Sequence, residues 1–308
     1  MDRPAAAGVT ARQRTKWIVV AAAATLCALT AAGGIDVSLL EHRLRHVRVS
    51  FPDGGPGQTW LLVGSDGTQH GAPGERADVI LLVHTGAPHT SVISVPRDLL
   101  LTRTEGGVER AALTYAEGPQ ALIDGLCRTL GVGATHLAII NRRGFKDAVD
   151  ALGGVTVHIN QRVRDRKSNL EIDETGDVHL DGAQALALVR SRHPQRLVDG
   201  TWVGVSENAG AIKRARNAAA VFNAIRSKAG ALRSNPIRLQ RTLWAATGDI
   251  TLDAGSDLTD LLGLVHAHGR VTVLPAARLP RTIALLADDR TRSVLAAAGY
   301  PATCTPRG

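Results

Sequence analysis

The sequence has little cysteine and few aromatic residues, and it lacks the motifs of common nucleotide and metal enzymes. Three cysteines occur in 308 residues, and Phe, Trp and Tyr together make up 3% of the chain. No CxxC or HExxH motif is present, and histidines such as His84, His136 and His193 show no ligand spacing, which disfavours zinc. There is also no GxxxxGK[ST] loop, no GxGxxG and no GxSxG. These absences exclude an ordinary nucleotide-dependent kinase.

Positive charge is in excess, with a formal net charge of +8. This balance suits an anionic partner, which can be nucleic acid, an acidic membrane or a phosphate-rich ligand. The N-terminus favours the membrane, because residues 17–35 contain no charge and follow a basic segment that holds Arg3, Arg12, Arg14 and Lys16. A helix of that length covers roughly 28 Å, close to the ~30 Å hydrocarbon core of a bilayer.

Positive charge ahead of the apolar segment predicts a cytoplasmic N-terminus and an exported remainder. We therefore expect a cytoplasmic basic tail at residues 1–16 and a single signal-anchor helix at residues 17–35. The alternative is a cleaved secretory signal with small residues at Thr30-Ala31-Ala32. Both interpretations export the folded part and argue against a nucleic-acid partner.

The cysteines fit an exported protein. Cys27 lies in the apolar segment, which leaves Cys127 and Cys304 outside it. An oxidising compartment favours a single disulfide between these two residues, and two unpaired thiols are the alternative that the sequence leaves open.

Beyond residue 36 the chain divides into a linker, one large domain and a tail. Residues 36–57 end in a Pro/Gly-rich stretch that is typical of a domain boundary. A catalytic domain is expected at residues 58–280 and a C-terminal tail at residues 281–308. Apolar runs predict strands at 60–63, 79–84, 91–95, 137–140, 155–159 and 271–274. Helical patterns alternate with them at 120–130, 145–152, 183–189, 208–228 and 258–268.

The alternation of strands and helices predicts an α/β sandwich around a central, largely parallel or mixed sheet. Residues 164–178 are polar and show no pattern, so a surface excursion is expected there.

Arginine and aspartate recur together at the ends of the predicted strands. Arg76 and Asp78 directly precede one strand, and Arg97-Asp98 directly follows the next. If these strands are antiparallel neighbours, the four side chains gather at one sheet edge, with Asp66 close by. Guanidinium groups bind phosphate oxygens, and paired carboxylates hold magnesium. An ordinary surface ion pair explains any single pair equally well, but several gathered charges favour a ligand site.

A second cationic arm follows in Arg190-Ser191-Arg192. On an extended segment both guanidiniums face one side and can clamp one phosphate, whereas on a helix they diverge into solvent. Arg214, near the start of the long helix expected at 208–228, is a candidate for a further contact.

Seven blocks taken in order resemble the LytR-CpsA-Psr family of cell-wall phosphotransferases. They are Leu61-Leu62-Val63-Gly64-Ser65-Asp66, Arg76-Ala77-Asp78, Ser94-Val95-Pro96-Arg97-Asp98, Tyr115-Ala116 with Gly118-Pro119, Phe145 with Val149-Asp150-Ala151-Leu152-Gly153-Gly154-Val155, Asp181-Gly182 through Gln184-Ala185-Leu186-Ala187, and Val189-Arg190-Ser191-Arg192-His193. The resemblance covers about residues 58 to 228 and weakens toward residue 280. An anchor helix before an extracytoplasmic domain is also how this family is built.

The resemblance implies a three-layer α/β/α sandwich with a central mixed sheet that holds a polyprenyl-pyrophosphate-linked glycan. It implies transfer of the glycan phosphate to a peptidoglycan sugar hydroxyl, with release of polyprenyl phosphate, at the outer face of the cell membrane of a Gram-positive, actinobacterial cell. The positions that match the family motifs have these implied roles: Asp66 and Asp78 bind Mg2+; Arg76, Arg97, Arg190, Arg192 and Arg214 hold the pyrophosphate with Arg110, which replaces the usual lysine; and Asp98 orients Arg97 or receives the acceptor's proton.

The sequence departs from the family pattern at three places. Asp66 lacks the arginine that is often found shortly after it. The usual glycine-arginine run followed by arginine and glutamines is Gly210-Ala211-Ile212-Lys213-Arg214-Ala215-Arg216 here, and Ala112 stands where an asparagine is usual. Two other functions therefore stay open: hydrolysis of the same lipid pyrophosphate, and a catalytically weakened protein that only binds it.

Overall fold

The computed structural model describes residues 38–52, 57–67, 74–86, 90–204, 207–232, 235–264, 271–300 and 304. The chain divides into two compact units, residues 1–43 and 44–308. In the first unit, residues 38–43 are helical. The expected cytoplasmic tail and signal-anchor helix lie outside the described residues. None of the helices within the described ranges combines the length and apolarity that a membrane crossing needs.

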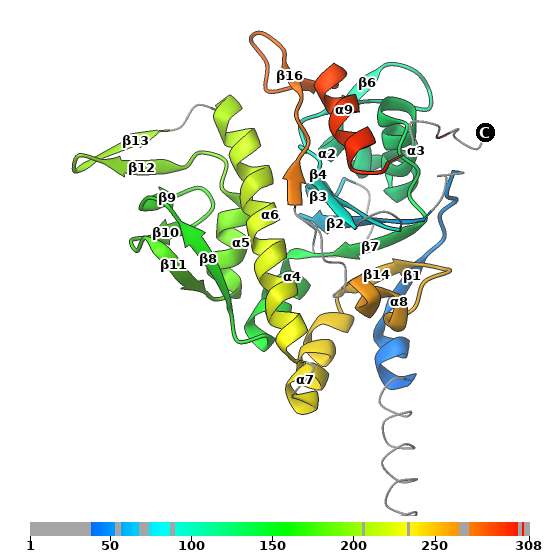
Figure 1. The fold of residues 1–308 in the computed structure, drawn as a ribbon, viewed down its shortest axis with the longest axis horizontal. Helices are drawn as coiled ribbons and strands as arrows, with labels where there is room; N and C mark the ends of the chain where they lie inside the picture. Colours follow the sequence, from blue (N-terminus) through cyan, green and yellow to red (C-terminus); the bar gives the residue numbers. More distant parts are fainter. Residues whose placement is uncertain are drawn as a thin grey trace, which may run out of the picture. The chain divides into compact units, whose positions relative to one another are not determined.

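The second unit is built on a seven-stranded mixed sheet with the order β1-β14-β7-β2-β3-β4-β15 (Figure 1). The strands are β1 (Arg45–Val47), β2 (Gln58–Ser65), β3 (Ala77–Thr85), β4 (Ser91–Ser94), β7 (His136–Ile140), β14 (Ile250–Asp253) and β15 (Val271–Val273). β2 pairs antiparallel with β3 and parallel with β7, and β3 pairs antiparallel with β4. The predicted mixed α/β fold is therefore confirmed. The pairing of β3 with β4 also meets the condition under which Arg76, Asp78, Arg97 and Asp98 gather at one sheet edge.

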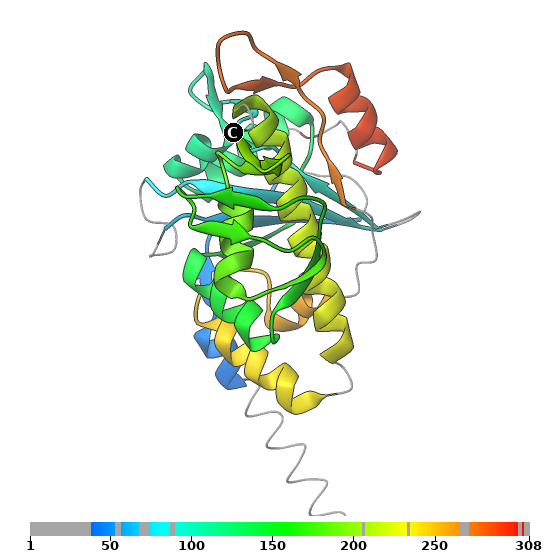
Figure 2. The ribbon, with the colours of Figure 1, turned by 90° about the vertical axis from the view of Figure 1, so that its left-hand side faces the viewer.

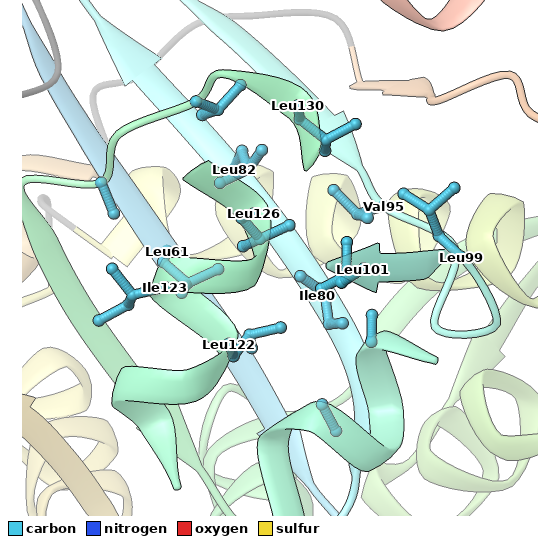
Figure 3. Close-up of a cluster of buried hydrophobic side chains, with 14 of the residues drawn as sticks. Leu61, Ile80, Leu82, Val95, Leu99, Leu101, Leu122, Ile123, Leu126 and Leu130 are labelled. Carbon is cyan, nitrogen blue, oxygen red and sulfur yellow. The ribbon is translucent and has the colours of Figure 1, made fainter. Parts of the chain in front are cut away.

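The helix α3 (Pro119–Leu130) covers one face of this sheet. Pro119 begins the helix where a missing N–H is tolerated, and Gly131 ends it with a left-handed φ of 68°. Leu122 and Leu126, one helical turn apart, pack among Leu61, Ile80 and Leu82 of the sheet (Figure 3). Burying each leucine stabilises the fold by about 1.5–3 kcal/mol, so this contact is a main attachment of the helical layer.

The same face also carries a group of short elements. They are the hairpin of β5 (Leu100–Thr102) and β6 (Val108–Arg110), the helix α2 (Ala111–Thr114) and the short 3-10 helix η1 (Tyr115–Glu117). Leu101 of β5 is fully buried in the core of this face. The hairpin therefore ends at Arg110 directly beside the sheet.

Four longer helices line the side of the sheet away from α3 (Figures 1 and 2). They are α4 (Arg142–Ala151), α5 (Gly182–Arg190), α6 (Glu207–Ala231) and α7 (Pro236–Thr247). One of them, α6, also runs past the sheet toward the level of α9 (Asp289–Ala297). α5 begins with a capping box between Asp181 and Gln184, and the carboxylate of Asp150 in α4 accepts a hydrogen bond from the Gly182 N–H at 2.7 Å. A second hydrophobic core fills the space among α4, α5, α6 and β8 (Val155–Ile159).

The expected surface excursion at residues 164–178 is wrong. This region contains β9 (Val163–Asp165), β10 (Leu170–Ile172) and β11 (Gly176–Leu180). β10 and β9 continue into β12 (Gln195–Val198) and β13 (Thr201–Gly204) as a four-stranded sheet, and β11 pairs with β8. Val163, Leu170 and Ile172 are buried in the second core. β9 and β10 have three residues each, which is too short for a repeating hydrophobic pattern. The polar residues around them therefore led to the expectation of an irregular surface segment.

The proposed linker and tail also differ from the expectation. The linker at residues 36–57 supplies the edge strand β1, which pairs with β14. The tail at residues 281–308 supplies β17 (Leu285–Leu286), which pairs with β16 (Ala277–Arg278), and the helix α9 (Asp289–Ala297). Leu285, Leu295 and Tyr300 are buried in the core of the α3 face, so this segment is part of the folded domain.

A disulfide joins Cys127 of α3 to Cys304. The choice that the sequence left open is therefore decided in favour of the bonded pair. The helix expected at residues 258–268 begins as predicted, because α8 (Leu258–Gly263) has a capping box between Asp257 and Asp260. Residues 265–268 of that expectation lie outside the described residues.

Candidate active site

Asp78 lies at a bulge where β3 leaves the regular ladder of the sheet. Gly64 of β2 pairs with Val79 and Ser65 pairs with Ala77, so Asp78 has no partner in β2. A bulge of this kind re-aims a side chain. The Asp78 carboxylate contacts three arginines: it accepts from Arg97, lies 3.2 Å from Nη2 of Arg192, and lies 3.6 Å from Nε of Arg190.

Asp98, just beyond β4, is the second carboxylate of the site and is 2% exposed. Its oxygens lie 2.5 Å from Nη2 of Arg214, 3.6 Å from Nη1 of Arg110 and 3.7 Å from Nε of Arg97. Arg97 contacts both Asp98 and Asp78 and therefore joins the two ion-pair groups. Backbone hydrogen bonds hold this turn, because the Arg97 carbonyl accepts from Ala112 N at 2.9 Å and the Asp98 carbonyl accepts from Leu285 N at 2.9 Å.

The second cationic arm is placed by the end of α5. Arg190 is the last residue of the helix, and Ser191, with ψ of 116°, turns the chain into an extended path. The helix thus ends between the two arginines, so Arg190 and Arg192 reach the same carboxylate of Asp78. The sequence left open whether they share a face or diverge, and the helix end decides that they share it.

Arg214 reaches the site from α6, which is tied to its neighbours near this residue. The Ala215 carbonyl accepts a hydrogen bond from Ser94 Oγ of β4 at 3.1 Å, and Asn217 Nδ2 donates to the Leu188 carbonyl of α5 at 3.1 Å. These two bonds fix α6 against the strand and the helix that carry the other arginines. Arg214 is accordingly held over Asp98.

Five arginines therefore meet two aspartates at this site, which leaves an excess of positive charge. Burial is the main reason that the pKa values of Arg97 and Arg214 lie below their ordinary value; Arg192 lowers both further, and Asp78 and Asp98 oppose this shift. Nε of Arg97, Arg190 and Arg214 is buried and has no hydrogen-bond acceptor within the described ranges. Buried donors without acceptors are costly, so these groups are suited to an anionic ligand.

Asp66 and Arg76 form a separate pair at the same end of the sheet. Asp66 accepts from the Arg76 backbone N at 2.7 Å and from Arg76 Nε at 3.1 Å. Ser65 pairs with Ala77 across the two strands, so Asp66 directly follows the first of these residues and Arg76 directly precedes the second. Arg76 is therefore two residues before Asp78 in the chain. Arg76 is 46% exposed and, among the residues that the structure describes, forms an ion pair with Asp66 alone, in contrast to the buried Arg97. The structure therefore places Arg76 at the rim of the arginine cluster.

Two carboxylates at this end of the sheet, those of Asp66 and Asp78, are available to bind a magnesium ion. The described residues hold no group of three or more His, Cys, Asp or Glu side chains arranged for a metal. Mg2+ is nevertheless commonly bound by one or two carboxylates together with water and substrate phosphates. Asp66 and Asp78 are hard oxygen donors that keep 18% and 11% of their side chains exposed, so their chemistry fits that mode.

Asp165 belongs to this site, although sequence reasoning did not select it. Its carboxylate is buried and accepts hydrogen bonds from Ser191 Oγ, Arg192 N and His193 N, the segment that carries the second arm. Burial alone would raise the pKa of Asp165, but the hydrogen bonds from His193, Ser191, Lys167 and Arg192 together hold it below its usual value. No local signal in the sequence pointed to it, because Asp165 stands in a polar stretch and its partners in that segment lie 26 to 28 residues away in the chain.

Comparisons with known proteins give the family. Residues 38–270 match the LytR_cpsA_psr family. A probable cell wall biosynthesis protein, LcpB of Corynebacterium glutamicum, is 33% identical over 153 residues, which cover 44% of this chain and 36% of that protein. The polyisoprenyl-teichoic acid–peptidoglycan teichoic acid transferase TagU of Bacillus cereus is 31% identical over 140 residues, 43% of each chain. This chain thus spans less than half the length of each of these two relatives.

Solved structures agree with that assignment. The structure of a LytR-Csp2A-Psr enzyme from Actinomyces oris superposes with a TM-score of 0.76 at 36% identity, covering 85% of this chain and 98% of that one. A structure of TagT bound to LI-WTA superposes with a TM-score of 0.60 over 82% of this chain and 98% of that one, and its 17% identity supports the fold alone. On the family match, the enzyme structure and the shared arrangement of the sheet, the chain belongs to the LytR_cpsA_psr family.

Proposed function

We propose that this protein is a membrane-anchored, magnesium-dependent phosphotransferase. It moves a polyprenyl-pyrophosphate-linked glycopolymer onto a sugar hydroxyl of peptidoglycan and releases polyprenyl phosphate. The family membership supports a role in transferring cell-wall glycopolymers, since relatives include a named teichoic acid transferase and a probable cell wall biosynthesis protein. The basic segment ahead of the uncharged residues 17–35 supports an anchored, outward-facing domain.

The observation that carries the proposal is the set of buried arginine donors without acceptors. Arg97, Arg190 and Arg214 come from a strand end and two helices, yet their side chains meet around Asp78 and Asp98. A pyrophosphate supplies several anionic oxygens within a small volume, and planar guanidinium groups bind such oxygens in pairs. The bound group would satisfy the buried Nε donors and balance the excess charge.

In the reaction, the arginines align the pyrophosphate and neutralise charge as it moves toward the leaving oxygen. The acceptor hydroxyl oxygen forms a bond to the phosphorus that bears the glycan. The bridging P–O bond breaks with its electron pair on polyprenyl phosphate, and the hydroxyl proton passes to solvent. Mg2+ held by Asp66 and Asp78 would supply further neutralisation of the phosphate oxygens.

Asp98 has the geometry of an orienting residue. Its carboxylate is 2% exposed and is shared by Arg97, Arg110 and Arg214. An acceptor sugar would have to displace these arginines to reach it. We therefore assign Asp98 to the placement of Arg97 and not to proton transfer.

The departure from the family pattern near Ala215 does not disturb this arrangement. Ala215 is 7% exposed and its carbonyl bonds to Ser94, while the preceding Arg214 still reaches Asp98. The arginine cluster is complete without a cation at position 215. This observation removes the departure near Ala215 as a reason to expect loss of the arginine cluster.

The test uses the full chain in detergent micelles with a polyprenyl-pyrophosphate-linked saccharide, with and without Mg2+ and peptidoglycan. We expect polyprenyl phosphate to be released and the saccharide to appear on peptidoglycan only when Mg2+ is present. Arg97→Ala should lower the rate about 100-fold or more, because it removes a group that stabilises developing charge. Arg290→Ala, which alters an exposed pair with Asp288, is the matched control and should leave the rate unchanged.

Release of the saccharide into water with no transfer to peptidoglycan would instead indicate a hydrolase. Binding of the lipid without any turnover would contradict an enzymatic role, and full activity of the Arg97→Ala variant would contradict the site assignment.

A further inference from the structure

Asp165 is a buried anion that makes four hydrogen bonds to neighbouring chain segments. Its side chain is 2% exposed. One carboxylate oxygen accepts from Ser191 Oγ at 2.9 Å and from the backbone N–H groups of Arg192 and His193, each at 2.8 Å. The other accepts from Lys167 N at 3.0 Å. Three of the four donors thus belong to the short segment 191–193.

The direction of these bonds matters for the arginines on either side of Ser191. Ser191 points toward Asp165, and its neighbours Arg190 and Arg192 point toward Asp78. The segment is therefore held between two carboxylates, one that binds its backbone and hydroxyl and one that binds its guanidiniums. Because Arg190 and Arg192 are 34% and 40% exposed, solvent alone would leave both long side chains many conformations.

We propose that Asp165 is a positioning residue that prearranges Arg190 and Arg192 for the pyrophosphate of the substrate. This inference rests on the proposed function, since the ligand is the same pyrophosphate. A carboxylate that fixes the backbone on both sides of Arg192 reduces the conformational entropy that the arginines would lose when the ligand binds. Asp165 itself touches no reacting atom.

The first test measures the affinity of the full chain for inorganic pyrophosphate by calorimetry, in wild type and in Asp165→Asn. The amide has one acceptor oxygen and a donor group, so it faces at least one of the four N–H or O–H donors with the wrong polarity. We expect binding weaker by about tenfold or more. Asp253→Asn is the matched control, because Asp253 is also a buried acceptor, from Leu137 N at 2.9 Å, Gly255 N at 3.0 Å and Ser256 Oγ at 2.6 Å. It lies outside the arm and should leave pyrophosphate affinity unchanged.

A double-mutant cycle separates positioning from a loss of stability. If Asp165 acts through Arg192, then Asp165→Asn should weaken binding much less in an Arg192→Ala background than in wild type. Additive effects of the two substitutions would overturn the inference. If loss of any buried carboxylate weakened binding by destabilising the fold, the Asp253→Asn control would lose pyrophosphate affinity as well.

Ser191→Ala keeps the test decisive if Asp165→Asn does not fold. It removes only the hydroxyl donor and should weaken pyrophosphate binding by a few-fold with an unchanged circular dichroism spectrum. Undiminished affinity in both Ser191→Ala and folded Asp165→Asn would refute the positioning role while leaving the proposed function intact. Failure of the wild-type chain to bind pyrophosphate would instead refute the proposed site, and with it this inference.

Discussion

Asp98 is enclosed by the guanidiniums of Arg97, Arg110 and Arg214 at a site that water hardly reaches. A buried ion pair gains little over an apolar pair, because desolvation offsets much of the attraction. Removing one partner is different, since the remaining charges stay buried without compensation. The carboxylate is therefore needed for stability as well as for placing the arginines.

We expect Asp98→Ala to lower the free energy of unfolding by about 3–5 kcal/mol, because it leaves buried arginines unpaired. Chemical denaturation followed by circular dichroism measures this change. Asp289→Ala is the control, since Asp289 pairs with Arg292 at the surface and is 95% exposed. Its unfolding curve should overlay that of wild type. Equal stability of Asp98→Ala and wild type would show that the arginines do not depend on this carboxylate.

At the residue scale, the sequence identified the arginines and aspartates of the site but not Asp165. Arg97 and Asp98 directly follow an apolar run, and this local position predicts that they lie at a sheet edge. Asp165 stands in a polar stretch, and its importance depends on Ser191, which is 26 residues away in the chain. No local pattern records a contact across that distance.

At the scale of elements, α5 sets the position of the second arm through its contact with α4. A Cβ atom on Gly182, the first residue of α5, would lie 2.3 Å from the Lys146 carbonyl oxygen of α4. A backbone oxygen cannot swing aside as a flexible side chain does. Gly182 is therefore required for the close approach of the two helices, and the other end of α5 carries Arg190.

Gly182→Ala should push α5 away from α4, lower the free energy of unfolding by about 1–3 kcal/mol, and reduce pyrophosphate affinity. Gly230→Ala is the matched control within α6, because a Cβ there meets no heavy atom of the described chain within 4 Å. It should stabilise the protein by about 0.5–1 kcal/mol, as alanine restricts the unfolded chain. Melting temperatures of both variants check whether stability changes in opposite directions, and calorimetry measures pyrophosphate affinity. A change of stability in the same direction in both variants would contradict the packing argument.

Long elements with clear periodicity were predictable, and short ones were not. Leu122, Leu126 and Leu130 recur every four residues in α3, and Gly131 marks its end. β9, β10 and β13 have three or four residues each, and their pairing in a second sheet depends on partners far along the chain. Such strands are formed by tertiary contacts and not by a pattern of their own.

At the scale of the whole molecule, the C-terminal segment packs into the main core and so completes the folded domain. α9 packs Leu295 into the core of the α3 face, and Cys304 bonds to Cys127 across a sequence separation of 177 residues. A cross-link over a long loop restricts the unfolded chain, which stabilises the folded state. The disulfide also agrees with an exported domain.

Replacing both cysteines, as Cys127→Ala with Cys304→Ser, should lower the free energy of unfolding by about 2–4 kcal/mol. Melting temperatures with and without reductant provide the measurement. Reductant should destabilise wild type and leave the double variant unchanged. A wild-type melting temperature that reductant does not change would show that the disulfide contributes nothing to stability.

By itself, the sequence determined the mixed α/β class, the main helices and most of the candidate acidic and cationic residues of the site. Each of these follows from spacing within a short stretch, where hydrophobic periodicity and strand-end charges are local signals. Only the tertiary structure decided which carboxylate each arginine binds. Arg192 reaches Asp78 across 114 residues and Arg214 reaches Asp98 across 116, and ion pairing depends on distance in space, which no local pattern specifies.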